Sequence, residues 1–178
     1  LVRLLKAAVP KDVAKHVHLG ATSQDVLDTA NALCLKACLE EADRSLEAAV
    51  RALAARAREH RATPMIGRTL MQPAIPITAG LKIARWAVAL DADRARLAEA
   101  QETGLALQLG GPVGALEALG ERHAAVRHRM ALALGLADVP SWQVHRNAWI
   151  DLLDRIGLVA LTAGKIARDV SLSMQPEV

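Results

Sequence analysis

The chain has 178 residues, about the length of one domain, which is enough to bury a hydrophobic core. Hydrophobic residues make up 52% of it and Phe and Tyr are absent, so the apolar side chains are mostly Ala, Leu, Val and Ile, which favours helices over sheets. The net charge of +3 comes from scattered Arg, and no apolar run approaches ~18 residues, so we expect neither nucleic-acid binding nor a membrane span.

The first informative segment runs from His18 to Asp25, where a glycine loop and two hydroxyls precede a predicted helix. Backbone N–H groups, hydroxyls and the positive end of a helix dipole converge at such a place, which suits a carboxylate or phosphate ligand. Thr22 and Ser23 suit equally well a purely structural role as helix caps. The local chemistry alone leaves both interpretations open.

Residues 24–61 contain neither Pro nor Gly, and their spacing predicts one long helix. The apolar positions that define its core stripe are Val26, Ala30, Leu33 and Ala37, then Leu46, Val50, Leu53 and Ala57. Helices much longer than the ~11–12-residue mean usually belong to bundles. Cys34 and Cys38 lie four apart on this helix with no second metal-spaced pair, so we expect reduced, packed thiols.

Residues 63–76 carry four helix breakers, Pro64, Gly67, Pro73 and Pro76, which predict an ordered loop. Helical patterns follow at residues 77–107, 121–134 and 146–173, with a Gly-rich connection at 110–114 and a stop at Gly135. The sequence therefore predicts a strand-free, all-α protein, an elongated bundle of long helices forming a single domain over residues 1–178. One chain cannot cover all the apolar stripes, so we expect an oligomer.

Two segments resemble signatures of the fumarase/aspartase superfamily. Residues 18–30, HLGATSQDVLDTA, resemble the first signature, and residues 67–80, GRTLMQPAIPITAG, resemble the second. Smaller similarities occur at residues 109–114, at Trp142 with Arg146, and at residues 164–170, so the resemblance covers nearly the whole chain. It implies the central helical domain of an L-aspartase-like fold and a homotetramer whose long helices share one core.

Position 70 separates the branches of this superfamily. Adenylosuccinate lyases carry a His there, whereas 3-carboxy-cis,cis-muconate cycloisomerases usually carry an apolar residue, and this chain has Leu70. Because Leu cannot transfer a proton, the resemblance favours a cycloisomerase of aromatic-compound catabolism, in the protocatechuate/beta-ketoadipate pathway. Gln143 departs from the His that the cycloisomerase pattern often has after Trp142.

The resemblance implies a small polycarboxylate substrate whose own carboxylate adds to an alkene to form a lactone, with no metal and no other cofactor. Preorganised donors stabilise the negative charge of such a reaction. Thr22, Ser23, Gln24, Thr69, Gln72 and Arg146 are the predicted substrate-binding residues, and His18 is a weaker candidate for proton transfer. Arg146 suits an exposed bundle position equally well.

Superfamily members continue into a Gly-Ser-Ser loop whose Ser usually abstracts the proton, so we expect the main catalytic Ser beyond Val178 and an inactive 178-residue chain. We also expect a further region before Leu1. Two alternatives stay open: an adenylosuccinate lyase-like or other fumarate-releasing lyase, and a non-catalytic helical scaffold. Residues 1–10 do not follow the order of a signal peptide, so we expect a cytoplasmic protein.

Overall fold

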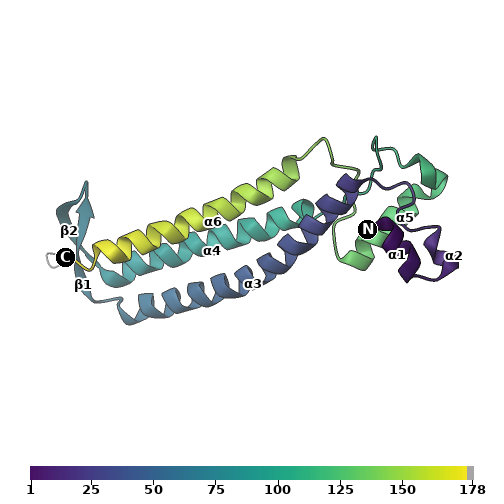
Figure 1. Cartoon of the computed structure of the whole chain (residues 1–178). Helices are drawn as coiled ribbons and strands as arrows, with labels where there is room; N and C mark the ends of the chain where they lie inside the picture. The colour runs from purple at the N-terminus through teal and green to yellow at the C-terminus, as the bar shows by residue number, and fades with distance from the viewer. Residues whose placement is uncertain (176–178) are drawn as a thin grey trace. The chain divides into compact units, whose positions relative to one another are not determined.

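The computed structural model describes residues 1–175 and is mainly helical (Figure 1), which confirms the all-α fold class. Its elements in chain order are α1 (Val2–Ala8), α2 (Lys11–Ala14), α3 (Ser23–Glu59), β1 (Pro64–Thr69), β2 (Gln72–Thr78), α4 (Ala79–Gly104), the 3₁₀ helix η1 (Glu117–Arg122), α5 (His123–Leu134) and α6 (Asn147–Leu172). The long helices predicted from the spacing of apolar residues are thus confirmed. Their ends differ from the prediction by at most three residues, as is usual for helix boundaries.

The described residues group into two compact units. Unit 1 contains Leu1–Ala37 and Glu102–Ile150, and unit 2 contains Cys38–Gln101 and residues 151–175. Helices α3, α4 and α6 each contribute residues to both units, so this grouping does not test the single-domain interpretation, which stays a prediction.

Helix α3 begins with a capping arrangement in unit 1. The backbone N–H of Thr22 donates to the Asp25 carboxylate at 2.9 Å, which is the reverse half of a capping box with Asp in place of Glu. The predicted core stripe is wrong over this first part of the helix, because Val26 is 51% exposed while Asp25, Asp28 and Thr29 are buried. Here the buried face is polar because it forms hydrogen bonds with neighbouring loops, and the apolar face points outward.

Residues 64–78 form an antiparallel hairpin, so the strand-free prediction is wrong for this segment. β1 and β2 pair from Pro64 opposite Thr78 to Thr69 opposite Gln72, with an irregularity between Ile66 and Arg68. In a two-stranded sheet both strands are edges, so proline, which lacks an N–H, can occupy positions that face away from the partner strand. The prolines that exclude a helix therefore do not exclude this hairpin.

A buried extended segment follows α4 in unit 1. Residues 105–109 are buried, and Ala106 pairs with Ala137 in an isolated parallel bridge. α5 ends at Gly135, as predicted; its φ of +61° and its N–H bonds to the carbonyls of Ala131 and Leu132 form a left-handed C-cap. Gln108 at 0% exposure is the most deeply buried polar residue of this segment.

Unit 2 consists of the hairpin and the adjoining parts of α3, α4 and α6. Leu39, Leu90, Leu97 and Leu152 are buried in it. Polar contacts join its helices: Arg94 of α4 pairs with Asp43 of α3 at 2.5 Å, and Thr162 of α6 donates a hydrogen bond to Asp93 of α4.

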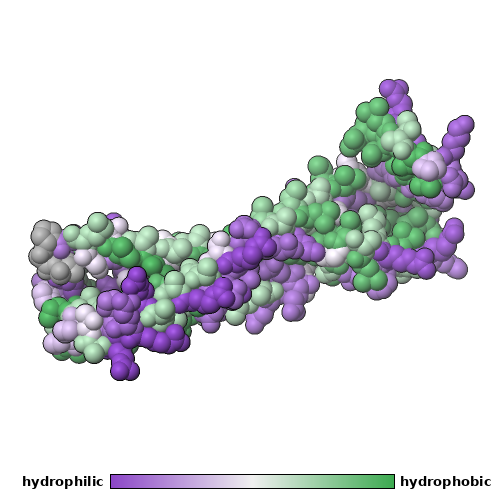
Figure 2. All heavy atoms as spheres, turned by 90° about the horizontal axis from the view of Figure 1, so that it is seen from below, coloured by the Kyte–Doolittle hydropathy of each residue, from purple (hydrophilic) through white to green (hydrophobic). Residues whose placement is uncertain are grey.

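Several large apolar side chains of the helices are nevertheless exposed, and Figure 2 shows hydrophobic residues over much of the face seen from below. Cys34 and Cys38 are free, as predicted, but both are exposed, so the prediction that they are packed is wrong for this chain. No helix among the described residues is long and apolar enough to cross a membrane.

Candidate functional site: the loop before α3 and its polar network

The segment from His18 to Gln24, which includes the start of α3, carries four of the predicted site residues in unit 1. His18 is exposed and left-handed, with a φ of +63°. Gly20, with a φ of +70°, lies so close to Ala118 that a Cβ would approach the Cβ of Ala118 to 2.9 Å. A Cβ on Gly111 would lie 2.5 Å from the carbonyl oxygen of Gly20. Both glycines are therefore required for the close contact between this loop and the 110–118 loop.

The Asp25 carboxylate fixes this loop from within the fold. It is 3% exposed and accepts four hydrogen bonds. One oxygen accepts from the backbone N–H of Gly110 and the amide of Gln108, both at 3.0 Å, and the other accepts from the backbone N–H groups of Thr22 and Gly111, both at 2.9 Å. Because a buried carboxylate needs such donors, the start of α3 and the 110–111 turn are tied to one group.

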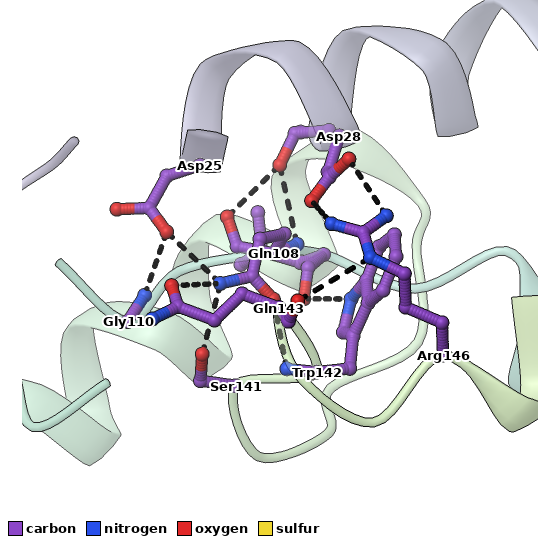
Figure 3. A network of polar contacts seen from close by, with 10 residues as sticks. Asp25, Asp28, Gln108, Gly110, Ser141, Trp142, Gln143 and Arg146 are labelled. Atoms are coloured by element: carbon purple, nitrogen blue, oxygen red, sulfur yellow. Dashed lines mark hydrogen bonds and ion pairs between the residues drawn. The ribbon is translucent and has the colours of Figure 1, made fainter. Parts of the chain in front are cut away.

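Gln108 lies at the centre of the network shown in Figure 3. Its side-chain nitrogen lies within hydrogen-bond distance of the Asp25 carboxylate, of the Ser141 hydroxyl at 2.9 Å and of the side-chain oxygen of Gln143 at 3.3 Å. Its side-chain oxygen accepts the backbone N–H of Trp142 at 2.8 Å. An amide group has two N–H donors, so these three acceptors share two protons. The contact with Gln143, the residue that departs from the cycloisomerase pattern, is the longest of the three.

Asp28 and Arg146 form a two-bond ion pair within unit 1. The guanidinium donates to the two carboxylate oxygens at 3.2 and 2.7 Å. The hydrogen bond to Asp28 raises the pKa of Arg146, against a smaller opposing effect of burial. The guanidinium also lies over the Trp142 ring at 5.2 Å, and that ring stacks on Trp149 with centroids 5.7 Å apart. The pair and the ring hold Arg146 in one orientation, with its side chain 34% exposed.

The structure thus assembles part of the predicted site. His18 and Thr22 lie in the loop before α3, Ser23 and Gln24 are the first two residues of α3, and Asp28 links this helix end to Arg146. Thr69 and Gln72 lie in unit 2, paired with each other on the two sides of the hairpin turn, and both are exposed. Ser23 and Gln24 are also exposed at the amino end of a 37-residue helix, where backbone donors favour an anion.

The sequence-based predictions do not single out Gln108 or Ser141, and they assign no site role to Asp25 or Asp28. An Asp three residues after Thr22 is a local signal of a capping box, so one of the four bonds of Asp25 was predictable. The other three cross 83 to 86 residues of chain, and no local pattern reports them.

Residues 1–175 contain no group of three or more His, Cys, Asp or Glu side chains arranged to hold a metal ion. The expectation that the reaction needs no metal or cofactor stays a prediction.

Comparisons with known proteins agree with the two signatures. The model of a family described as lyase matches residues 2–178. A 3-carboxy-cis,cis-muconate cycloisomerase of Bradyrhizobium diazoefficiens is 45% identical over the whole chain, and an adenylosuccinate lyase of Methanocaldococcus jannaschii is 33% identical. The chain spans 40% and 39% of the length of these two relatives.

Among solved structures, the crystal structure of beta-carboxy-cis,cis-muconate cycloisomerase from Acinetobacter calcoaceticus sp. ADP1 superposes with a TM-score of 0.92 at 36% identity. The match covers 99% of this chain and 42% of that one. Fold, signatures and sequence identity agree over the whole length of the chain. The chain therefore belongs to the lyase family, within the fumarase/aspartase superfamily.

Proposed function

We propose that the intact protein is a 3-carboxy-cis,cis-muconate cycloisomerase, an intramolecular lyase that forms a lactone from a small polycarboxylate. The observation that carries this proposal is Leu70, which lies 92% exposed at the tip of the hairpin between Thr69 and Gln72. The adenylosuccinate lyase branch that the signatures resemble carries an imidazole at this position. A leucine there supports a reaction in which the proton comes from another group.

Sequence identity supports the same choice of branch. The cycloisomerase relative is 45% identical to this chain and the adenylosuccinate lyase relative is 33% identical. A fumarate-releasing lyase is kept as the alternative because both relatives match the full chain. Turnover of adenylosuccinate but not of carboxymuconate by the intact protein would favour it, and turnover of neither would favour the scaffold.

The proposed chemistry uses the exposed donor groups among the predicted residues. One substrate carboxylate adds to the alkene, a carbon–oxygen bond forms, and the neighbouring carbon receives a proton. In this proposal Thr22, Ser23 and Gln24 bind a carboxylate at the amino end of α3, and Thr69 and Gln72 bind a second one at the hairpin. Arg146 supplies a cation whose position Asp28 and Trp142 fix, and His18 is a candidate for proton transfer.

The test is turnover of carboxymuconate by the intact protein and its variants, without added metal. Ser23→Ala and Gln72→Ala are expected to lower kcat/KM by about 10–100-fold each, because each removes a donor to developing charge. Ser45→Ala, an exposed hydroxyl on the same helix, is the matched control and should leave turnover unchanged. Full activity in both site variants would show that the site is wrongly assigned.

The 178-residue chain alone is expected to fail in the same assay, because the serine that the resemblance implies lies beyond Val178. Loss of a proton-transfer group commonly lowers rates by ~10²–10⁴-fold. Lactone formation by this chain at a rate near that of the intact protein would contradict the proposal.

We also propose that the intact protein is a homotetramer in which long helices share a core. The exposed apolar side chains Val88 at 70% and Leu161 at 71% support this, because a water-facing helix rarely leaves such residues uncovered. Sedimentation of a folded monomer at micromolar concentration would contradict it. The cytoplasmic location stays a prediction.

A further inference from the structure

A cavity of about 380 Å³ lies within unit 2, between the hairpin, α4 and the end of α6. Its volume falls in the ~300–1,000 Å³ range of small-molecule pockets. Among residues 1–175, four cationic side chains and one carboxylate line it: Arg68, Lys82, Arg85, Lys165 and Asp169. None of the substrate-binding residues of the proposed function is among the described residues that line it.

The negative charge of Asp169, the carboxylate among the described lining residues, is already paired with a cation. Asp169 accepts a hydrogen bond from the indole N–H of Trp86 at 2.8 Å and pairs with Lys165 one helical turn earlier. Burial alone would raise the pKa of Asp169, but the bonds from Lys165 and Trp86 outweigh it and the pKa is lowered. Asp169 therefore stays charged, and its charge is matched by Lys165.

Lys82 and Arg85 remain as positive charges in the cavity wall. Neither has a carboxylate within 4.0 Å among residues 1–175. Lys82 instead lies over the Trp86 ring, 5.8 Å from its centroid, and Lys165 lies 6.0 Å from the same centroid. Two cations next to a partly enclosed apolar wall attract and hold an anion more strongly than exposed cations do.

Most of the other lining side chains are apolar, although Ser173 and Gln175 also line the cavity. Met65, Ile77, Leu81 and Leu172 line it beside the Trp86 indole. A bare inorganic ion would leave these side chains unused, whereas an organic molecule would cover them while placing its charges on the cations.

We propose that this cavity, here called the Trp86 pocket, binds a small organic molecule with two or more carboxylate or phosphate groups, separately from the substrate site. The charged groups would contact Lys82 and Arg85, and the carbon skeleton would pack against Trp86 and Leu81. The pocket is independent of the proposed function, because the residues assigned to that function and the residues of the pocket are different.

The experiment is calorimetric titration of the intact protein at low salt with citrate, inorganic phosphate and acetate, followed in parallel by tryptophan fluorescence. Citrate is expected to bind this pocket once per chain and to change the fluorescence of Trp86, a change that Trp86→Phe removes. Arg85→Ala and Lys82→Ala should each weaken citrate binding about 10-fold, the effect of one hydrogen bond to a charged group. Arg168→Ala, which removes one exposed charge of unit 2 outside the pocket, should have little effect.

Gln72→Ala distinguishes citrate binding at the substrate site from citrate binding at the Trp86 pocket. It should leave binding at the Trp86 pocket unchanged. Equal weakening by Arg85→Ala and Arg168→Ala would show a general charge effect and would overturn the proposal. Phosphate binding as tight as citrate binding would overturn the organic part of it. Absence of any Trp86-dependent binding at millimolar citrate would overturn it altogether.

Discussion

At Asp25, one buried carboxylate accepts bonds from three backbone N–H groups and one side-chain amide, which come from both sides of the loop contact. The loop that carries Thr22 and Ser23 therefore takes its position from Asp25 and Gln108, and not from its own residues. A helix cap by itself would position one turn of helix, whereas this group fixes two loops against each other.

Asp25→Asn in the intact protein tests this role at the scale of one residue. The amide places an NH₂ group where a carboxylate oxygen now accepts backbone N–H groups, so we expect a loss of about 2–4 kcal/mol in the free energy of unfolding. Urea denaturation measures it. Asp12→Asn, at an exposed carboxylate of α2, is the matched control and should change the free energy by less than ~0.5 kcal/mol. A similar small change in Asp25→Asn would contradict the role.

At the scale of the element, the hairpin turn is the least expected feature of the chain. Leu70 and Met71 both have positive φ, +48° and +62°, in a two-residue connection, the conformation in which Asn-Gly is usual. A left-handed φ costs an ordinary residue about 1–2 kcal/mol. Leu and Met are therefore unfavourable residues for the conformation of this turn.

Leu70→Asn should therefore stabilise the hairpin, by about 0.5–1 kcal/mol, because Asn tolerates left-handed φ better than Leu. Thermal unfolding of the intact protein measures the gain. Leu70→Ala also removes the exposed apolar side chain, but Ala does not favour left-handed φ. It therefore separates the effect of losing the side chain from the effect of relieving the backbone. Equal melting temperatures for the two variants would show that turn conformation does not limit stability.

The Arg94–Asp43 pair between α3 and α4 gives a pH-dependent prediction. The hydrogen bond from Arg94 lowers the pKa of Asp43 below its usual 3.8, although burial opposes it. A lowered folded-state pKa stabilises the fold above pH 3.8, and this contribution is lost as pH falls through the folded-state pKa.

Arg94→Gln should consequently destabilise the intact protein by about 0.5–1 kcal/mol at pH 7, a small effect because the pair is partly exposed and screened by solvent. The difference from wild type should shrink as pH falls below 3.8. Urea denaturation at pH 7 and at pH 3 measures both values, with Arg58→Gln as the control at an exposed arginine. If the free energies of unfolding of wild type and Arg94→Gln differ by the same amount at both pH values, the difference does not come from the ionised Asp43 carboxylate.

At the scale of the whole molecule, the helices of a single chain leave large apolar side chains exposed to solvent. Val26 and Leu27 of unit 1 and Val88 and Leu161 of unit 2 are all more than half exposed. Such residues on long helices are accounted for when a second copy covers them, which is the reason for proposing a tetramer.

Leu161→Glu should dissociate the proposed tetramer, because a charge would be buried at the shared core. Sedimentation velocity of the intact protein at micromolar concentration measures the change. Leu4→Glu makes the same chemical change at a 68% exposed leucine of α1, outside the long helices, and should leave the assembly intact. A Leu161→Glu tetramer as stable as the wild type would contradict a shared core at this face.

The sequence by itself determined the long helices, the stop at Gly135 and the family. These depend on local properties: apolar spacing, the absence of breakers over residues 24–61, a glycine where the helical pattern stops, and two contiguous signatures. The resemblance also identified Leu70 as the residue that distinguishes the branches.

Only the tertiary structure decided which face of α3 is buried, how the prolines of residues 64–78 are used, and which groups hold Ser23 and Arg146 in place. Hydrophobic spacing gives the period of a helix but not the direction it faces, and near Asp25 hydrogen bonds to residues more than 80 positions away decide that direction. A proline excludes a helix but does not choose between a loop and an edge strand, because that choice depends on the partner strand. The contacts that position the site are distant in sequence, and no local pattern specifies them.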